Sequence, residues 1–299
     1  MKKPLFTGCG TALITPFKNG EPDIDRFRSL VNRQLKAGID ALIVCATTGE
    51  APTLKKNERT ELIRSCVSLA KGKAPVIAGT GSNDTGAAVE LSREAEALGA
   101  DGVLVVTPYY NKTTQAGLVA HYTAIAEAVN IPVILYNVPS RTGVSCSAET
   151  YAELAKLENI VGVKEASGSF ALIQDTLNRC PGDFCIWSGN DEDTAAIMAL
   201  GGVGVISTAA NLIPDDMREL THLALSGSIR KAGLLQLRMS ELIHALFCEV
   251  NPIPVKAAMS RLGLCSGELR LPLCEISAKS RDILYAAMDS YGIRLNPQG

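Results

Sequence analysis

The stretch Pro75–Gly99, PVIAGTGSNDTGAAVELSREAEALG, contains the repeating unit that decides the fold of this chain. An apolar run over Pro75–Gly79 leads into a glycine-rich turn, and a segment with apolar residues at helical spacing follows. Asp84 stands directly before this segment, where its carboxylate can accept a hydrogen bond from the first turn of a helix. The stretch therefore predicts a strand, a loop and a helix in succession.

The same unit recurs along most of the chain. Helix start signals of the same kind stand at Asp23, Asn57 and Ser147. The apolar runs are nearly continuous rather than alternating, which is typical of parallel strands buried on both faces. The eight predicted strands are Gly10–Ile14, Ala41–Ala46, Pro75–Gly79, Gly102–Thr107, Pro132–Val138, Ile160–Glu165, Phe184–Ser188 and Gly202–Ser207.

Strand, loop and helix units in series form either an open doubly wound sheet or a closed barrel. The count of eight favours closure, so we expect an α/β fold, a (β/α)8 TIM barrel. After about residue 213 the strand pattern stops, and only helical segments follow. We therefore expect a catalytic barrel over residues 1–224 and a C-terminal α-helical domain over residues 225–299.

Composition excludes several classes of protein. With 46% hydrophobic and 20% charged residues among 299, the chain is globular rather than disordered. Its 29 basic and 31 acidic residues give a net charge of −2, and no basic stripe is interleaved with aromatic residues. We therefore expect neither nucleic acid nor an anionic membrane as a partner.

Cysteine usage and the N-terminus indicate the compartment. Nine cysteines, an odd number without a C-x-x-C pair, indicate a reducing environment, and those in apolar runs, such as Cys45 and Cys185, are expected to be buried thiols. Pro4 and Gly8 interrupt the apolar core that a signal peptide would need. No stretch approaches the ~18 apolar residues of a membrane span. We expect a cytoplasmic location.

A barrel of this kind places its chemistry at the carboxyl ends of the strands. These ends are rich in hydroxyl groups and include one lysine, Lys164, in IVGVKEAS. We expect Val161 and Val163 on one face of this strand and Gly162 and Lys164 on the other. Burial favours the neutral amine, which can form a Schiff base with a ketone. Alternatively, the lysine snorkels to solvent or pairs with a carboxylate.

Hydroxyl groups at three other strand ends can converge on this lysine. Thr47, Tyr110 and Tyr136 each follow a different predicted strand, so together they can form a proton relay. Schiff-base chemistry needs protons moved onto and off the carbinolamine oxygen, and hydroxyl chains can carry them. Each tyrosine alone can equally be an amphipathic ring that caps a strand end. The combination with a strand-end lysine favours the relay.

Two features at the strand ends are suited to carboxylates. The turn Thr47–Gly49 offers hydroxyl and backbone N–H groups that can enclose a small carboxylate. Arg141, in Pro-Ser-Arg-Thr-Gly, can bind a second carboxylate through its planar guanidinium, or can form a surface salt bridge instead. The arrangement indicates two carboxylated substrates, with one carbonyl bound to the lysine.

These residues lie in stretches that resemble the dihydrodipicolinate synthase family of pyruvate-dependent class I aldolases, which also contains N-acetylneuraminate lyase. The resemblance implies a lyase that binds pyruvate as an imine on Lys164 and condenses it with L-aspartate 4-semialdehyde. The product would be 4-hydroxy-tetrahydrodipicolinate, on the route to diaminopimelate and lysine. The stretches that carry the resemblance span the barrel and are GTALITPF, ATTGEAPTL, GTGSN, VTPYYNKTTQAG, ILYNVPSRTG, IVGVKEASG, SGND and GVISTAAN.

The resemblance also implies roles for the relay residues and an assembly. Tyr136 would be the proton shuttle and Thr47 its hydrogen-bonded partner. Tyr110 would be the third member, which in the family reaches in from the neighbouring subunit. The family is commonly a homotetramer built as a dimer of dimers. From the residues themselves, we expect no cofactor and no metal.

The same resemblance implies the substrate contacts. Thr48 would hold the pyruvate carboxylate and Arg141 the semialdehyde carboxylate, while Gly189 and the backbone of Ile206 would line the pocket. The alternative is another pyruvate-dependent aldolase of the family, such as a sugar-acid lyase. Arg141 favours the synthase, because lyases of long sugar acids are built to bind hydroxyls at that entrance.

Family members that lysine inhibits differ from this chain in the segments that contact the inhibitor. This chain keeps Asn83 and Tyr109. Two added cations and a missing carboxylate would repel dicationic lysine, so we expect weak or absent feedback inhibition. The residues that depart from the pattern are Ala51, Pro52, Lys56, Arg59 and Ala87.

Other functions fit the sequence less well. Gly79–Gly86 follows a strand but misses the dinucleotide fingerprint, and the three histidines, His121, His222 and His244, form no zinc-binding pair. The loops after the last two strands show no extra phosphate site for pyridoxal phosphate. A non-catalytic binding barrel would be expected to lack the lysine or the tyrosines, and both are present.

Overall fold

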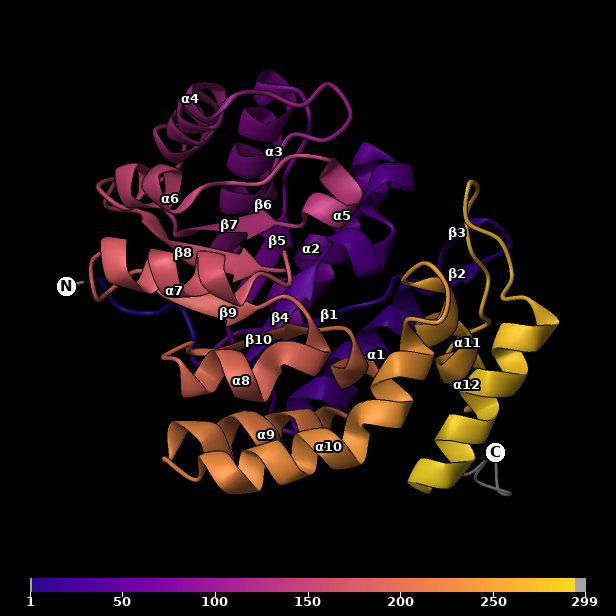
Figure 1. The fold of residues 1–299 in the computed structure, drawn as a ribbon. Helices are drawn as coiled ribbons and strands as arrows, with labels where there is room; N and C mark the ends of the chain where they lie inside the picture. Colours follow the sequence, from indigo (N-terminus) through magenta and orange to yellow (C-terminus); the bar gives the residue numbers. More distant parts are fainter. Residues whose placement is uncertain (1, 294–299) are drawn as a thin grey trace.

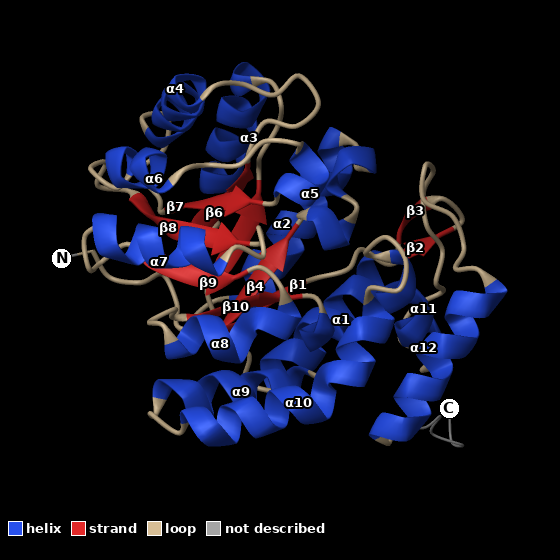
Figure 2. Cartoon of the chain, in the orientation of Figure 1, coloured by secondary structure: helices blue, strands red, loops and turns tan. Residues whose placement is uncertain are grey.

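The computed structural model describes residues 2–293 as a closed barrel of eight parallel strands surrounded by helices (Figures 1 and 2). The strands pair in the order β1-β10-β9-β8-β7-β6-β5-β4, and β4 closes the ring on β1. The predicted TIM barrel with C-terminal helices is confirmed. Its strands are β1 (Gly8–Ala12), β4 (Ala41–Val44), β5 (Val76–Gly79), β6 (Gly102–Val106), β7 (Val133–Asn137), β8 (Ile160–Glu165), β9 (Cys185–Ser188) and β10 (Gly204–Ser207).

Helices follow the strands and cover the outside of the barrel, as Figure 1 shows. Short 3-10 turns, η1 (Thr47–Gly49), η2 (Ala51–Thr53), η3 (Asp191–Asp193) and η4 (Ala209–Asn211), stand at several strand ends. The covering helices are α1 (Ile24–Lys36), α2 (Lys56–Ala70), α3 (Thr85–Ala97), α4 (Gln115–Ala126), α5 (Pro139–Thr142), α6 (Ala148–Leu154), α7 (Phe170–Arg179), α8 (Thr194–Ala199) and α9 (Pro214–Leu225). Within residues 2–293, no helix has the length and apolar character needed to cross a membrane.

The barrel strands are buried on both faces, as their apolar runs predict. Side chains of the inner face, among them Ile43, Ile134 and Trp187, pack in a cluster inside the ring. Phe6 stacks on Trp187 there, with ring centroids 5.2 Å apart. The outer faces join the covering helices in a second, larger cluster. Burial of each large apolar side chain contributes about 1.5–3 kcal/mol, so this double layer stabilises the frame of the site.

A β-bulge in β8 corrects one prediction from the sequence. Val133 pairs with Ile160 and Ile134 pairs with Gly162, so Val161 has no counterpart on β7. The extra residue shifts the alternation: Val161 packs inside the barrel, whereas Val163 packs outside. The expectation that these two valines share a face is therefore wrong.

The helix start signals are confirmed at three of the four predicted positions. The side chains of Asp23, Asp84 and Ser147 each accept a hydrogen bond from the first turn of the helix that follows. The fourth prediction, Asn57, is wrong, because α2 begins at Lys56. There the side chain of Glu58 caps the helix instead, by accepting a 2.7 Å hydrogen bond from the backbone N–H of Lys55.

A small hairpin that the sequence analysis did not predict follows β1. Its strands, β2 (Phe17–Lys18) and β3 (Glu21–Pro22), are too short to show a periodic pattern. Asn19 and Gly20 form the turn with φ angles of 55° and 80°. Asn-Gly between strands is a strong hairpin signal, so this dipeptide could have predicted the hairpin.

The C-terminal helices pack on one side of the barrel, in orange and yellow in Figure 1. They are α10 (Ile229–Leu246), α11 (Ile253–Arg261) and α12 (Ala278–Tyr291). Their apolar side chains, such as Met239, Met259 and Met288, belong to the same cluster as the outer faces of the strands. The domain boundary expected between residues 224 and 225 falls in the last turn of α9 and stays a prediction.

We predict that Gly162→Ala destabilises the protein through the bulge. A Cβ at this position would lie 2.1 Å from the carbonyl oxygen of Cys185 on the neighbouring strand. Overpacking of this kind costs about 1–3 kcal/mol, measured as the free energy of unfolding in urea. The matched control is Gly233→Ala in α10, where an added Cβ meets nothing within 4 Å and gains helix propensity. Equal stability of the two variants would contradict the prediction.

Candidate active site

Lys164 lies near the carboxyl end of β8 with its side chain 5% exposed. Its Nζ is 4.3 Å from the centroid of the Tyr136 ring, and the two residues are neighbours across β7 and β8. On its other side, Lys164 is paired in register with Trp187 of β9, which is fully buried. The amine therefore lies against the electron-rich face of a tyrosine ring.

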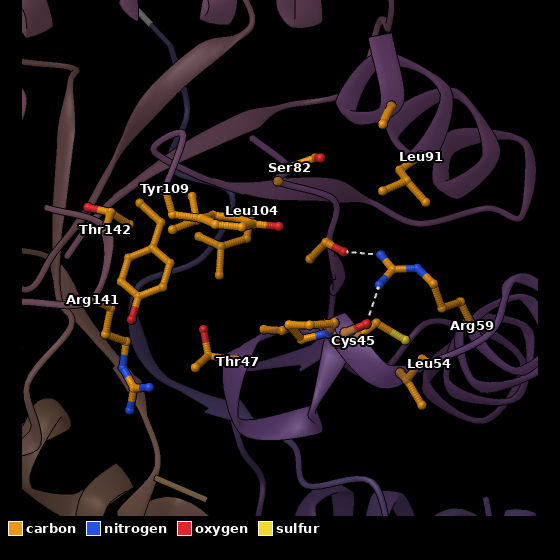
Figure 3. A pocket seen from close by; sticks show the side chains of 18 of the residues that line it. Cys45, Thr47, Leu54, Arg59, Ser82, Leu91, Leu104, Tyr109, Arg141 and Thr142 are labelled. Carbon is orange, nitrogen blue, oxygen red and sulfur yellow. Dashed lines mark hydrogen bonds between the residues drawn. The ribbon is translucent and has the colours of Figure 1, made fainter. Parts of the chain in front are cut away.

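A cavity of about 550 Å³ opens at the carboxyl ends of β4 to β7. Thr47, Tyr136 and Arg141 all line it, and Figure 3 shows Thr47 and Arg141 together at one end. Leu104 and Val106 contribute apolar wall. The structure thus brings three of the predicted site residues to one cavity. Lys164 contacts this cavity through Tyr136 and is not itself a lining residue.

Thr48 is buried beside the cavity and is not one of its lining residues. Its Oγ1 lies 3.3 Å from the hydroxyl of Thr208 and accepts a 3.0 Å hydrogen bond from Nδ2 of Asn251. The next residue, Gly49, accepts a 2.7 Å hydrogen bond from the hydroxyl of Thr15. The turn after β4 is therefore tied to the turn after β10, to Asn251 before α11 and to the segment after β1.

Arg141 is exposed at the rim of the cavity, in the short helix α5. Its guanidinium donates a 3.3 Å hydrogen bond to the backbone carbonyl of Asn251. Asn251 thus contacts two predicted site residues, Thr48 through its side chain and Arg141 through its backbone. Its buried Oδ1 has no hydrogen-bond partner among residues 2–293. The sequence analysis missed this residue, because it lies in a helical region more than a hundred residues away.

Gly189 follows β9, which is the neighbour of the strand that carries Lys164, and Ile206 lies on β10, the next strand of the ring. The N–H of Gly189 donates a 2.7 Å hydrogen bond to the carbonyl of Glu165, and an added Cβ would lie 2.6 Å from that of Ala166. Glycine is therefore required for the close approach of these two turns. Ile206 packs inside the barrel in the same cluster as Tyr136.

Tyr110 is the one predicted relay residue that the structure does not bring to the others. It is 89% exposed, and its backbone is left-handed with a φ of 67°. Tyr109, its neighbour, lines the cavity instead. Of the three predicted relay residues, Tyr136 and Thr47 line the cavity of their own chain and Tyr110 does not.

Two buried carboxyl groups stand close to the lysine strand, and the sequence analysis missed both. Asp191 accepts hydrogen bonds from the backbone N–H groups of Thr208 and Ala209 at 3.1 and 2.9 Å. Burial raises the pKa of Asp191, and the positive charge of Lys164 opposes this rise. The carboxyl group thus joins the ends of β9 and β10, and it lies close enough to Lys164 for the lysine charge to affect its pKa.

Glu165 occupies the opposite face of β8 from Lys164. It accepts hydrogen bonds from the hydroxyl of Tyr151 at 2.8 Å and from the side chain of Asn137 at 3.0 Å. Burial raises the pKa of Glu165, while these donors stabilise its ionised form. Because Asn137 follows Tyr136 directly, this network fixes the ends of both strands that carry the lysine and the tyrosine.

The far end of the cavity holds the residues that depart from the lysine-binding pattern. Figure 3 shows Arg59 there between Leu54 and Leu91, with its guanidinium bonded to the carbonyls of Gly79 at 2.6 Å and Ala51 at 3.4 Å. All five departing residues line this cavity, as does Tyr109. Two carboxylates, Glu90 and Glu94, line it as well.

Comparison with known proteins places the chain in a family. Residues 5–290 match the model of the "Dihydrodipicolinate synthetase family". The chain belongs to this family. A relative from Thermoanaerobacter sp. (strain X514), named 4-hydroxy-tetrahydrodipicolinate synthase, is 49% identical over 97% of this chain and 98% of its own length.

Solved structures of dihydrodipicolinate synthases agree with this membership. The enzyme from Thermotoga maritima superposes with a TM-score of 0.95 at 45% identity, covering 97% of this chain and 100% of the other. The chloride-inhibited enzyme from Acinetobacter baumannii, solved in complex with pyruvate, superposes with a TM-score of 0.94 at 42% identity, covering 96% and 99%. The family's barrel and C-terminal helices thus extend over nearly the whole chain.

Proposed function

We propose that this member of the dihydrodipicolinate synthetase family condenses pyruvate with L-aspartate 4-semialdehyde at the cavity beside Lys164. Its relatives are named 4-hydroxy-tetrahydrodipicolinate synthase, so the chain is an enzyme with this activity. The observation that carries the residue assignment is the buried amine of Lys164, 4.3 Å from the ring centre of a tyrosine that lines the cavity. A relative was solved with pyruvate bound, which supports this substrate.

In the proposed reaction, Nζ of Lys164 adds to the ketone carbon of pyruvate. The nitrogen lone pair forms the new C–N bond, and the ketone oxygen takes up two protons and leaves as water. Loss of a methyl proton then gives an enamine, whose carbon attacks the aldehyde of the second substrate. The aldehyde oxygen gains a proton. The amino group of the second substrate then attacks the imine carbon and loses its protons, while Nζ of Lys164 takes up a proton and leaves as the free amine, which closes the ring of the product. Protons must therefore move at both the lysine nitrogen and the substrate oxygens.

Tyr136 and Thr47 are the groups that we propose to move these protons. Tyr136 is 6% exposed, touches the amine through its ring and lines the cavity with Thr47. A hydroxyl pair can accept and return a proton without placing a fixed charge beside the imine. Pairs of this kind typically contribute ~10²–10⁴-fold in rate.

Two sites are proposed for the substrate carboxylates. The turn at Thr48 would hold the pyruvate carboxylate through its hydroxyl and backbone N–H groups. Arg141, at the exposed rim, would hold the carboxylate of the semialdehyde. Gly189 and Ile206 are proposed to line the pocket beside the lysine strand. Because Arg141 is exposed, it is accessible to the semialdehyde after pyruvate has bound to the lysine.

Tyr110 is proposed to act in a neighbouring subunit of a homotetramer built as a dimer of dimers. Tyr110 is 89% exposed and directly follows Tyr109, a residue that lines the cavity of its own chain, so its ring is available to a second chain at this point. The relay of each site would then contain hydroxyls from two chains.

The proposed function is tested by reducing the enzyme with borohydride in the presence of pyruvate. We expect mass spectrometry to find a reduced pyruvyl adduct on Lys164 and none on the second buried lysine, Lys256. The same sample should turn over L-aspartate 4-semialdehyde in a coupled assay, and Lys164→Met should lose both signals. An adduct without turnover would indicate another aldolase, such as a sugar-acid lyase. Absence of the adduct would indicate a binding barrel.

Complementation between two inactive variants tests the position of Tyr110. We expect Tyr110→Phe and Lys164→Met each to have low activity alone. Coexpressed hybrids should regain activity, because a chain with Lys164 intact receives Tyr110 from its partner. If Tyr110 acted within its own chain, each hybrid site would lack one group, so no recovery would contradict the proposal.

Feedback inhibition by lysine is predicted to be weak. Arg59 and exposed Lys56 add positive charge to the far end of the cavity, and Lys56 partly neutralises Glu94 at 3.8 Å. Steady-state assays with added L-lysine should show little inhibition, whereas Lys56→Glu should increase it by removing repulsion. Inhibition of the unmodified enzyme by millimolar lysine would contradict the prediction.

A further inference from the structure

A second lysine at the catalytic end of the barrel, Lys256 of α11, is fully buried. Its Nζ donates a 2.7 Å hydrogen bond to Oε1 of Glu50 and a 2.9 Å hydrogen bond to the carbonyl of Thr15. The ring of Phe17 lies 4.4 Å from the same nitrogen. The side chains of Lys256 and Glu50 are 0% and 1% exposed, so the ion pair is closed to solvent.

Glu50 directly follows the turn Thr47–Gly49, which carries two of the proposed site residues. Its backbone is left-handed, with φ 54° and ψ 39°, a conformation that a non-glycine residue adopts only at an energetic cost. Its N–H donates to the carbonyl of Thr47 at 3.0 Å, and its Oε2 accepts from the backbone N–H of Arg270 at 3.0 Å. Both carboxylate oxygens are thus held by the C-terminal domain.

The same C-terminal segment is hydrogen-bonded to the turn Thr47–Gly49 at a second point. Asn251 precedes Lys256 in the stretch NPIPVK and donates its side-chain hydrogen bond to Thr48. The turn is therefore fixed at Thr48 and at Glu50 by residues that are five positions apart in the sequence. A displacement of this segment would move the hydroxyls of Thr47 and Thr48 together.

A buried ion pair is not in itself a strong source of stability. Removing two charges from water costs free energy that their attraction often fails to return, and an apolar pair of similar volume is frequently as stable. The Lys256–Glu50 pair must, however, satisfy its geometry at three elements at once: α11, the turn after β4 and the segment after β1. The specific effect of this ion pair is therefore to fix the position of the turn Thr47–Gly49 rather than to stabilise the fold.

We infer that Lys256 and Glu50 are positioning residues, which hold the turn Thr47–Gly49 in the geometry that the reaction needs. The inference rests on the proposed function, because it assigns the pair a role through Thr47 and Thr48. Misplacement of the turn weakens the carboxylate site, which raises the KM for pyruvate, and moves the Thr47 hydroxyl, which lowers kcat. Displacements of about 1 Å can cost ~10²-fold in rate.

The decisive variant is the double substitution Lys256→Met with Glu50→Gln. Either single substitution leaves one buried charge without its partner and is expected to impair folding. The double variant removes both charges and keeps similar side-chain volumes, so its thermal unfolding should lie near that of the unmodified enzyme. We expect its kcat/KM for pyruvate to fall by about 10–100-fold, with changes in both kcat and KM.

The matched control is Arg261→Met on the same helix. Arg261 pairs with Asp289 of α12 at 2.9 Å and has no contact with the turn. It should therefore lose some stability and keep the kcat and KM of the unmodified enzyme. A purely structural role for Lys256 would make the two variants behave alike.

A second variant, Glu50→Asp, covers the case in which the double variant does not fold. It keeps the charge but shortens the side chain by one methylene, so it should pull the turn toward α11 and raise the KM for pyruvate. Borohydride trapping at low pyruvate concentration should show less adduct than in the unmodified enzyme. Unchanged KM, kcat and trapping in a folded variant would overturn the positioning role. Failure of the unmodified enzyme to trap pyruvate would overturn the proposed function instead.

Discussion

The closed ring of backbone hydrogen bonds between eight parallel strands is the constraint on which the rest of the structure depends. Because every strand runs in the same direction, all carboxyl ends meet at one face of the ring. Thr47, Tyr136 and Lys164 are far apart in the chain, yet each stands at or directly after such an end. Closure also removes sheet edges, so the apolar inner and outer layers can form without unpaired backbone. The common position of these strand ends thus follows from the topology and does not depend on which side chains they carry.

One inserted residue in β8, Val161, determines which face of the strand carries Lys164. Ile160 packs on the outer face of β8, and strict alternation from it would place the side chain at 164 outside as well. The bulge at Val161 resets the alternation, so Lys164 faces the barrel interior and meets the ring of Tyr136. Gly162 allows this because its backbone approaches Cys185 too closely for any Cβ. The strand that carries Lys164 is therefore irregular three residues before the lysine.

The sequence predicts this architecture well where the signal is periodic or local. Eight apolar runs and three helix caps reveal the barrel and its catalytic face, and the strand ends supply most of the proposed site. The bulge in β8 cannot be predicted from the sequence, because it is defined by pairing with β7 and the apolar pattern of β8 alone does not show it. Asn251 and Lys256 are missed because their contacts, with Thr48 and Glu50, lie over two hundred residues away in the sequence. In addition, a lysine on a helix normally indicates a solvent-exposed face.

Two buried lysines at one end of a barrel can have opposite functions because their partners differ. An amine becomes a nucleophile only after it loses its proton, and an ion pair opposes that loss. Burial lowers the pKa of Lys256 and the charge of Glu50 opposes this change, while hydrogen bonds to Glu50 at 2.7 Å and to Thr15 at 2.9 Å occupy the amine and hold the turn. Lys164 has no ion-pair partner within residues 2–293, since the buried carboxylate of Asp191 is bonded to backbone N–H groups instead. The lysine without a carboxylate partner, beside a tyrosine ring that lines the cavity, is therefore the one that we propose to bind the ketone.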